Sequence, residues 1–343
     1  RKRASPVAMM SARAVIGLKA LVAFGLIWWL LASLDWREAL DKILHVSPFW
    51  LGVALLLNVV AIVTSTWRWR RILGVLGFQI SFMYASKLCW AGAFFSTVLP
   101  SNIGGDIVRI AMARRIQAVS AVLSSVLIER STGLCMLLTM SAISLFYFPE
   151  VQAMLGDWNW QVILLIFVVA SLLASTSIVL WQSPAVREYR ERKSEVEGPI
   201  AAIWQKLNEV TQAIFDYSSR PLELILTCAV SVLFYLILCA FQWSLIRCVG
   251  GDIGVREVLL VVPLVTLITM LPITINGLGI TEGAFVLLYG YFGLDVDTAL
   301  AAAVVRRIMI TVVAMFGVIP WLKDREQSPE GSKPVDIPET SSL

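Results

Sequence analysis

The sequence is poor in charge and in histidine, and both shortages restrict what the protein can do. Charged residues make up 15% of its 343 residues, whereas 58% are hydrophobic and the mean hydropathy is +0.79. Soluble globular chains are about 45 to 50% apolar and about 25% charged, so this composition excludes a soluble protein. The chain has a single histidine, His45, which excludes multi-histidine metal sites. We therefore expect no metal centre.

The sequence also lacks the motifs of nucleotide-dependent and hydrolytic enzymes. It contains no G-x-x-x-x-G-K-[ST], no G-x-G-x-x-G after a strand, no H-E-x-x-H and no G-x-S-x-G. Its five cysteines have no C-x-x-C spacing and lie mainly in apolar runs, where cysteine behaves as a small hydrophobic residue. We therefore expect no disulfide framework, no cofactor, no ATP-driven chemistry and no nucleic-acid partner.

Long apolar stretches are the main feature that the sequence does have. Six of them have about the 17 to 25 residues needed to cross a bilayer: 14–34, 49–66, 119–147, 161–181, 222–246 and 297–321. Two further apolar regions, 80–105 and 257–293, are interrupted by proline and glycine. We predict an all-α polytopic membrane protein with six full transmembrane helices and two re-entrant helical hairpins. Eight full-length spans are the alternative.

The distribution of lysine and arginine predicts the orientation in the membrane. With both hairpins re-entrant, 20 of these residues fall on one side and four on the other, and the larger group includes clusters at 68–71 and 109–115. Loops rich in positive charge face the cytoplasm. We therefore predict that both termini and the loop 184–221 are cytoplasmic.

The spans divide the chain into two membrane repeats. We predict a cytoplasmic segment 1–13, a first repeat 14–147, a second repeat 161–322 and a disordered tail 323–343, which is rich in proline, serine and glutamate. Each repeat contains one hairpin. Apolar residues recur at helical spacing in the second half of the loop 184–221, which predicts an amphipathic helix. This helix either lies on the inner leaflet or packs against the bundle.

The two interrupted regions carry polar residues in the same order. After a Leu-Pro pair, the first has Asn102, Gly104, Gly105 and Asp106, and the second has Asn276, Gly277, Gly279 and Glu282. The next span carries Glu129 and Arg130 in the first half and Arg306 and Arg307 in the second. Because each half has three crossings, the second copy enters from the opposite face. Paired interrupted segments in such inverted repeats mark the binding site of a transporter.

These polar residues predict an anion-binding site near the membrane midplane. Charged side chains at that depth are costly and need a partner or a wet cavity, and arginines and helix N-termini favour anions. We expect Arg130, Arg306 and Arg307 to contact the substrate, together with the backbone around the asparagines and glycines. We expect Asp106, Glu129 and Glu282 to balance charge or to gate the site, three acids against three arginines.

Each of these residues also has a simpler interpretation. Asp106 could cap a short helix that starts at Ile107, and Glu129 could neutralise an arginine without contacting a substrate. The glycines could serve only tight backbone turns.

The motifs resemble those of the lysylphosphatidylglycerol synthase transmembrane-region family. The similar segments are Phe94-Phe95-x3-Leu99-Pro100-x3-Gly104-Gly105-Asp106-x2-Arg109, then Glu129-Arg130, then Pro272-x4-Gly277-Leu278-Gly279-x2-Glu282-Gly283. The resemblance covers residues 14–322 and implies a protein of the bacterial or archaeal cytoplasmic membrane that acts on lipids. The soluble synthase domain is not expected, because only a short polar tail follows Leu322.

We therefore expect a lipid translocator that moves a phospholipid or polyprenyl-phosphate-type lipid between leaflets, and we do not expect an enzyme. Its expected partners are membrane lipids, with proteins of envelope biosynthesis as further candidates, and the sequence leaves the oligomeric state open. A non-catalytic subunit of an envelope assembly complex is one alternative. A membrane-embedded transferase with Asp106 or Glu282 as general base is another.

Overall fold

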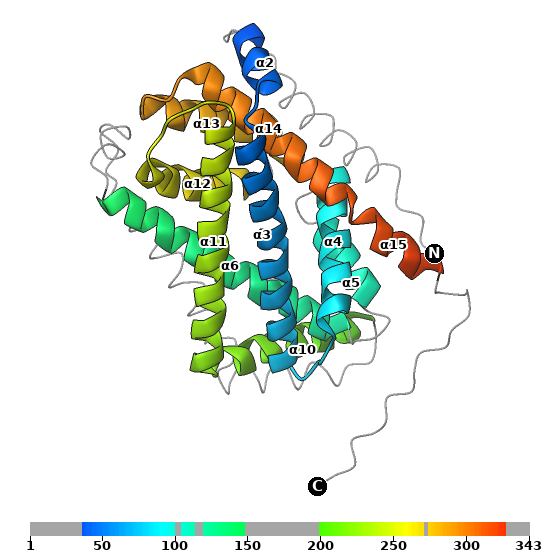
Figure 1. The fold of residues 1–343 in the computed structure, drawn as a ribbon. Coiled ribbons are helices and arrows are strands. Elements are labelled where there is room, and N and C mark those ends of the chain that lie inside the picture. The colour runs from blue at the N-terminus through cyan, green and yellow to red at the C-terminus, as the bar shows by residue number, and fades with distance from the viewer. Residues whose placement is uncertain (1–35, 100–103, 114–118, 148–198, 271–273, 327–343) are drawn as a thin grey trace, which may run out of the picture.

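The computed structural model describes residues 36–99, 104–113, 119–147, 199–270 and 274–326, and within these ranges every regular element is a helix. In chain order they are α2 (Trp36–Leu44), α3 (Pro48–Val75), α4 (Phe82–Val98), α5 (Gly104–Ala113), α6 (Val119–Tyr147), α10 (Pro199–Ser218), α11 (Pro221–Cys248), α12 (Val255–Met270), the 3-10 turn η1 (Ile275–Gly277), α13 (Ile280–Tyr291), α14 (Val296–Met315) and α15 (Val318–Glu326). Figure 1 shows their arrangement.

Four helical segments in the described part of the chain are long and apolar enough to cross a membrane. They are Pro48–Val75, Val119–Ile143, Pro221–Cys248 and Val296–Leu322. These coincide with four of the six spans expected from the sequence, and the other two, 14–34 and 161–181, lie outside the described residues. The prediction of an all-α polytopic membrane protein is thereby confirmed, while the arrangement of six spans and two re-entrant hairpins stays a prediction.

The helices α3 and α11 form the centre of the molecule and run antiparallel to each other (Figure 1). Each has 28 residues and begins with proline, which suits the first helical position because the N–H there has no partner within the helix. At one end the Ser47 N–H donates to the Cys248 carbonyl at 2.8 Å. At the other end the Arg220 guanidinium donates to the Val75 carbonyl at 3.3 Å.

Two pairs of shorter helices follow α3 and α11. The pairs are α4 with α5 and α12 with α13, and the partners pack against each other. Their lengths are 17, 10, 16 and 12 residues, less than the about 20 residues of a full crossing. The first pair begins at the end of the molecule where α10 lies and the second at the end where α2 lies (Figure 1). The order of elements is therefore repeated in the opposite direction.

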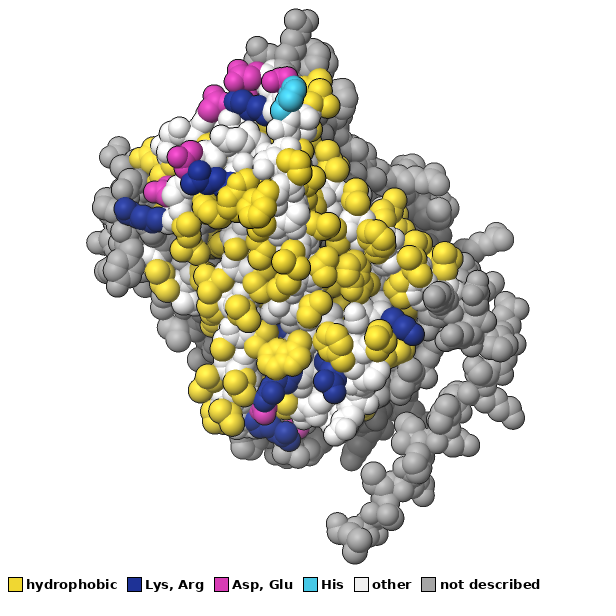
Figure 2. Space-filling view, in the orientation of Figure 1, with side chains coloured by type: hydrophobic (Ala, Val, Ile, Leu, Met, Phe, Trp, Pro, Cys, Tyr) yellow, Lys and Arg dark blue, Asp and Glu magenta, His cyan; other side chains and the backbone are white. Residues whose placement is uncertain are grey.

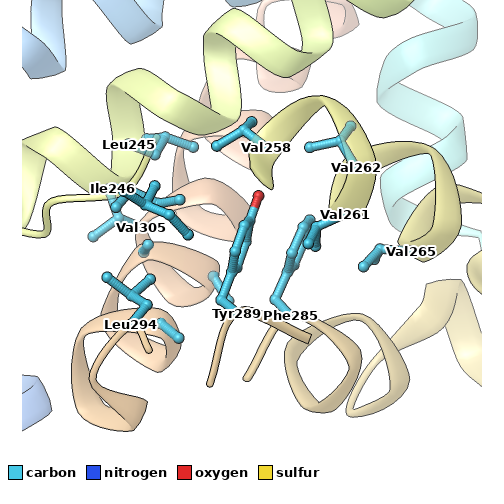
Figure 3. Close-up of a cluster of buried hydrophobic side chains, with 14 of the residues drawn as sticks. Leu245, Ile246, Val258, Val261, Val262, Val265, Phe285, Tyr289, Leu294 and Val305 are labelled. Atoms are coloured by element: carbon cyan, nitrogen blue, oxygen red, sulfur yellow. The ribbon is translucent and has the colours of Figure 1, made fainter. Parts of the chain in front are cut away.

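The largest hydrophobic core lies in the second repeat. Valines of α12 pack on one side of Phe285 and Tyr289, and Leu245 and Ile246 of α11 pack near Tyr289 (Figure 3). The two aromatic rings are stacked, with centroids 5.6 Å apart and an interplanar angle of 5°. This packing fixes α13 against its neighbours, and Glu282 lies one turn before Phe285 on the same helix.

Two predictions at the ends of elements need correction or refinement. The helix α10 packs against α6, with Val210 and Tyr217 buried, so its described C-terminal half follows the bundle-packing alternative. The predicted disordered tail began at residue 323, but α15 continues to Glu326. The helix therefore extends beyond the apolar stretch predicted for the last span. The rest of the tail, 327–343, lies outside the described residues.

Candidate functional site

The interrupted segments of the two helix pairs meet inside the molecule. The Asn276 side-chain amide donates to the carbonyl oxygen of Thr97, near the end of α4, at 3.1 Å. Asn276 itself has a left-handed backbone with φ of 51°, and Gly277 follows with φ of 67°. Asparagine and glycine tolerate this region far better than other residues, so the sequence Asn-Gly permits the turn that brings the amide to α4.

Each helix pair contributes one acid that binds an arginine of the next long helix. In the first repeat, Asp106 on α5 accepts from Arg130 on α6, with Nη2 and Oδ2 2.6 Å apart. In the second, Glu282 on α13 accepts from Arg307 on α14, with Nε and Oε1 2.6 Å apart. Four residues that the sequence singled out are thus brought together as two equivalent ion pairs.

Glu129 is the centre of a second, fully buried ion-pair group. Its Oε1 accepts from Arg68 Nη2 at 3.0 Å and from the Ser65 hydroxyl at 3.1 Å. Its Oε2 accepts from Arg109 Nη2 at 2.6 Å. The three charged residues are 6 to 7% exposed. A single carboxylate therefore holds two guanidinium groups away from water, and the predicted role of Glu129 in gating stays a prediction.

The two arginines around Glu129 are held by aromatic and hydroxyl groups from other helices. The Arg109 guanidinium lies 4.5 Å from the Trp69 ring centroid, a cation–π contact that stabilises a desolvated cation. The Trp69 indole N–H in turn donates to the Ser125 hydroxyl at 2.9 Å. Arg68 Nη1 donates to the Ser231 hydroxyl on α11 at 3.0 Å. The network therefore links α3, α5 and α6 of the first repeat to α11 of the second.

Arg68 and Arg109 belong to the candidate site, although the predicted distribution of positive charge placed both elsewhere. It assigned both to cytoplasmic clusters, and their burial lowers the predicted inside count from 20 to 18. A signal for Arg68 was available, because it continues a helical stripe with Asn58, Ala61 and Ser65, whereas Arg70 does not. For Arg109 the signal was its position three residues after Asp106.

Arg306 occupies the place that Glu129 has in the first repeat, but its surroundings differ. Its guanidinium lies 5.4 Å from the Phe285 ring centroid, and among the described residues no carboxylate lies within 4.0 Å of it. Counting from the paired acids, Arg109 follows Asp106 by three residues and Phe285 follows Glu282 by three. An arginine over a phenyl ring thus replaces the buried ion pair of the first repeat.

The predicted balance of three acids and three arginines is wrong once the buried partners are included. The charged groups of this network are Asp106, Glu129, Glu282, Arg68, Arg109, Arg130, Arg306 and Arg307. Five cations stand against three carboxylates, which leaves an excess of two positive charges. Because isolated charge is costly in a membrane interior, this excess favours an anionic ligand.

The glycines of the first repeat allow two helices to approach closely. A side-chain carbon on Gly105 would lie 2.2 Å from the Gly92 carbonyl oxygen and 2.1 Å from the Ser96 hydroxyl, and one on Gly104 would lie 2.8 Å from the Leu99 side chain. Glycine is therefore required here by packing between α4 and α5. Its predicted role in backbone anion binding stays a prediction, and Asn102 lies outside the described residues.

The acids also have local structural roles. Asp106 is the third residue of α5, so it does not cap a helix that starts at Ile107. Glu282 accepts from the Gly279 N–H at 2.8 Å and thereby fixes the start of α13. Arg307 donates to the carbonyls of Asn276 at 3.2 Å and Gly277 at 3.4 Å. In the second repeat the ion pair therefore also holds the interrupted segment in place.

One cluster of carboxylates outside this network has the spacing of a metal site. Oxygens of Glu38, Asp295 and Asp297 lie within 4.8 Å of one another. The Lys42 ammonium, however, is 2.9 Å from Glu38 and 2.8 Å from Asp295. A lysine side chain therefore already supplies the positive charge that this cluster requires.

Comparisons with known proteins agree with this architecture. Residues 16–317 match the family described as Lysylphosphatidylglycerol synthase TM region. The chain is also similar to a UPF0104 membrane protein of Methanocaldococcus jannaschii, with 20% identity over 88% of this chain and 93% of the relative. A second UPF0104 membrane protein, from Methanothermobacter thermautotrophicus, is 22% identical over 90% of this chain and 94% of the relative.

The family match covers the helix pairs, the ion pairs and the four long apolar helices. These helices and the matched region together indicate a multi-pass integral membrane protein. The chain belongs to the lysylphosphatidylglycerol synthase transmembrane-region family.

Proposed function

We propose that the protein is a flippase-like lipid translocator that moves a lipid with an anionic, phosphate-bearing headgroup between the two membrane leaflets. The headgroup crosses near the contact of the two helix pairs while its acyl or prenyl tails stay in the bilayer. Arg306 is the principal anion contact, and Arg130 and Arg307 assist. The protein forms no covalent bond with the lipid, and movement is downhill or coupled to an ion.

The observation that carries this proposal is the excess of two positive charges in the charge network of the two helix pairs, where Arg68 and Arg109 are buried and Arg306 and Arg307 partly buried. The acids compensate three of the five cations, and Arg306 faces a phenyl ring instead of a carboxylate. A guanidinium keeps its charge at any physiological pH, so it cannot lower its cost by losing a proton. A phosphate that enters the network neutralises the excess, and this neutralisation favours anionic over uncharged lipids.

The proposal is tested with pure protein in liposomes that contain a small fraction of tail-labelled lipid. The rate at which label becomes accessible to an impermeant quencher measures leaflet exchange, and extraction of the lipids detects any covalent product. Exchange of anionic lipid without product is the expected result. A covalent product would instead support a transferase, and no exchange with any lipid would support a subunit that needs partner proteins.

The role of Arg306 is tested by replacement in the same assay. Arg306→Gln should slow exchange of an anionic lipid more than tenfold, about 1.4 kcal/mol, and should slow a zwitterionic lipid much less. Arg306→Lys keeps the charge and should retain most of the anionic exchange. Arg256→Gln removes an exposed charge near the α2 end and serves as the control. Equal loss for all lipids in Arg306→Gln would contradict anion recognition.

We also propose that the protein lies in a bacterial or archaeal cytoplasmic membrane with the α10 end toward the cytoplasm. Arg70, Arg71 and Arg220 lie at that end, and such positive charge favours the inner side. In a cysteine-free background, His45→Cys should react with an impermeant thiol reagent in intact cells and Glu209→Cys should not. The reverse pattern would overturn this orientation.

A further inference from the structure

A separate, strongly basic cavity lies at the α10 end, between the last turns of α3 and the first turns of α11. Its volume is about 810 Å³, and its lining includes Arg70, Arg71, Arg220, Glu223 and Trp67. Four of its α3 lining residues, Arg70, Arg71, Gly74 and Val75, lie beyond Arg68, by about 3 to 10 Å at 1.5 Å per residue, whereas Trp67 is the neighbour of Arg68. The cavity is therefore distinct from the site proposed above.

The cavity holds two arginines whose charge no described acid neutralises. Arg71 is compensated, since its Nε and Nη2 donate to the two oxygens of Glu223 at 3.0 and 3.2 Å. Arg70 Nε donates to the Ile80 carbonyl at 2.9 Å, and Arg220 Nη1 donates to the Val75 carbonyl at 3.3 Å. Among the described residues no carboxylate lies within 4.0 Å of either.

These contacts prepare both arginines to bind an anion. Each guanidinium uses one nitrogen to bind a main-chain carbonyl, which restrains the group, and keeps further N–H donors for a second acceptor. Phosphate oxygens match this planar set of donors, as carboxylate oxygens do, and can accept two parallel hydrogen bonds from one guanidinium. Gln79 and Ser81 also line the cavity and add neutral hydrogen-bonding groups.

Exposed apolar side chains lie on the two helices, α3 and α11, that flank the basic cavity. Trp67, at its edge, is 41% exposed, and Leu222 and Ile225 in the first turns of α11 are 68% and 63% exposed. Figure 2 shows the arginines at this end gathered directly below a broad hydrophobic face. Tryptophan is typical of the membrane–water boundary. A ligand at this place can keep its phosphate in the cavity and its apolar part against these side chains.

We infer that this cavity binds the phosphate-bearing headgroup of an anionic lipid in the leaflet at the α10 end. Arg70 and Arg220 bind the phosphate, and Trp67 packs against the glycerol or the first carbons of the tails. A water-soluble phosphate compound would gain nothing from the apolar border, which is why we favour a lipid. The inference concerns binding alone and does not depend on translocation.

Gly74 offers a direct test, because it lines the cavity and a Cβ atom there would meet no atom within 4 Å. Gly74→Glu therefore introduces a carboxylate at the cavity wall where the backbone leaves room for a side chain to begin, and Gly74→Gln is the matched variant of the same size. The solubilised full-length protein is titrated with tail-labelled phosphatidic acid in mixed micelles. Unlabelled phosphatidic acid, phosphatidylcholine and glycerol 3-phosphate are the competitors, and thermal unfolding verifies that each variant folds.

We expect Gly74→Glu to bind phosphatidic acid at least tenfold more weakly than Gly74→Gln. Both variants keep the buried network unchanged, so lipid held there does not affect the comparison. Phosphatidic acid should compete at least tenfold better than glycerol 3-phosphate, and phosphatidylcholine should compete poorly. Equal binding by the two variants would overturn the site. Equal competition by glycerol 3-phosphate would show that the ligand is a soluble phosphate and not a lipid.

Arg70→Gln and Arg220→Gln extend the test to the proposed ligands themselves. Each should weaken phosphatidic acid binding by about tenfold, while Arg256→Gln, an equal loss of charge at the other end, should not. Unchanged binding in both variants would contradict the assignment of these two arginines. Because no transport is measured, these results are independent of whether the protein moves lipids.

Discussion

The two repeats share an arrangement of helices but treat their buried charges differently. In the first, Glu129 binds two buried arginines, and in the second the equivalent Arg306 lies over Phe285. Each arginine of the network in the first repeat thus contacts a carboxylate, whereas Arg306 in the second does not. The difference teaches that two copies of one helix arrangement can carry opposite charges at equivalent positions.

Removal of Glu129 should have the largest effect on this comparison. Glu129→Gln leaves Arg68 and Arg109 buried without a counter-charge, and breaking a buried pair in this way costs about 3 to 5 kcal/mol. We expect loss of folded protein, measured by the yield of monodisperse protein and by thermal unfolding. Arg306→Gln, at the equivalent position, should remain folded. Equal stability of the two variants would remove the distinction between the repeats.

The close approach of α4 and α5 should be the next most sensitive feature. Gly105→Ala places a methyl group 2.2 Å from the Gly92 carbonyl oxygen, and overpacking of this kind costs about 1 to 3 kcal/mol. Gly52→Ala in α3 meets no atom within 4 Å and should be neutral or slightly stabilising. Midpoints of thermal unfolding compare the two. An unchanged midpoint of thermal unfolding in Gly105→Ala would show that α4 and α5 can move apart at little cost in stability.

The equivalent ion pairs should respond unequally to loss of guanidinium geometry. Arg307 uses three nitrogens to reach Glu282 and two backbone carbonyls, whereas Arg130 uses two nitrogens for one oxygen of Asp106. Arg307→Lys should therefore slow lipid exchange by about tenfold, about 1.4 kcal/mol. Arg130→Lys should slow it by less than about threefold. A larger effect at Arg130 would contradict the proposal that the second repeat supplies the principal anion contact.

The smallest expected effect concerns the contact of α2 with α14. The Lys42 ammonium lies 2.8 Å from Asp295, and this hydrogen bond, partly opposed by burial, lowers the pKa of the Asp295 carboxyl. A lowered pKa means that the ion pair contributes its full stability above the ordinary carboxyl pKa of about 3.9 and loses it as the pH falls through the lower, folded value.

Asp295→Asn should therefore lower the thermal midpoint slightly at pH 7, and the difference from the unmodified protein should shrink at acidic pH. Because the pair is largely exposed, the change should stay within the range of surface ion pairs, below about 1 kcal/mol. A difference that grows toward acidic pH would contradict this sign.

The scaffold could be predicted from the sequence because hydrophobic length and helix breakers are local signals. Apolar runs located α3, α6, α11 and α14, and the Pro-Gly interruptions located the two helix pairs. The equal order of Asp106 and Glu282, and of Arg130 and Arg307, in the two halves singled these residues out, but their pairing came only from the structure. These signals need no knowledge of which helix faces which.

The charge network could not be predicted completely, because its composition depends on contacts between distant helices. A count of positive residues cannot separate Arg68, which points inward to Glu129, from Arg70 two residues later. Nor can it show that Phe285 stands where the first repeat has Arg109. The predicted neutral balance was wrong for this reason, and the excess of positive charge emerged only from the packed structure.

The hydrogen bond between Asn276 and Thr97 has a consequence for sequence variation. The donor is a side-chain amide and the acceptor is a main-chain carbonyl, so any residue can supply the acceptor at position 97. Position 276 must instead combine an amide with a left-handed backbone, and asparagine meets both requirements best. Relatives should therefore vary freely at the first position while retaining asparagine at the second.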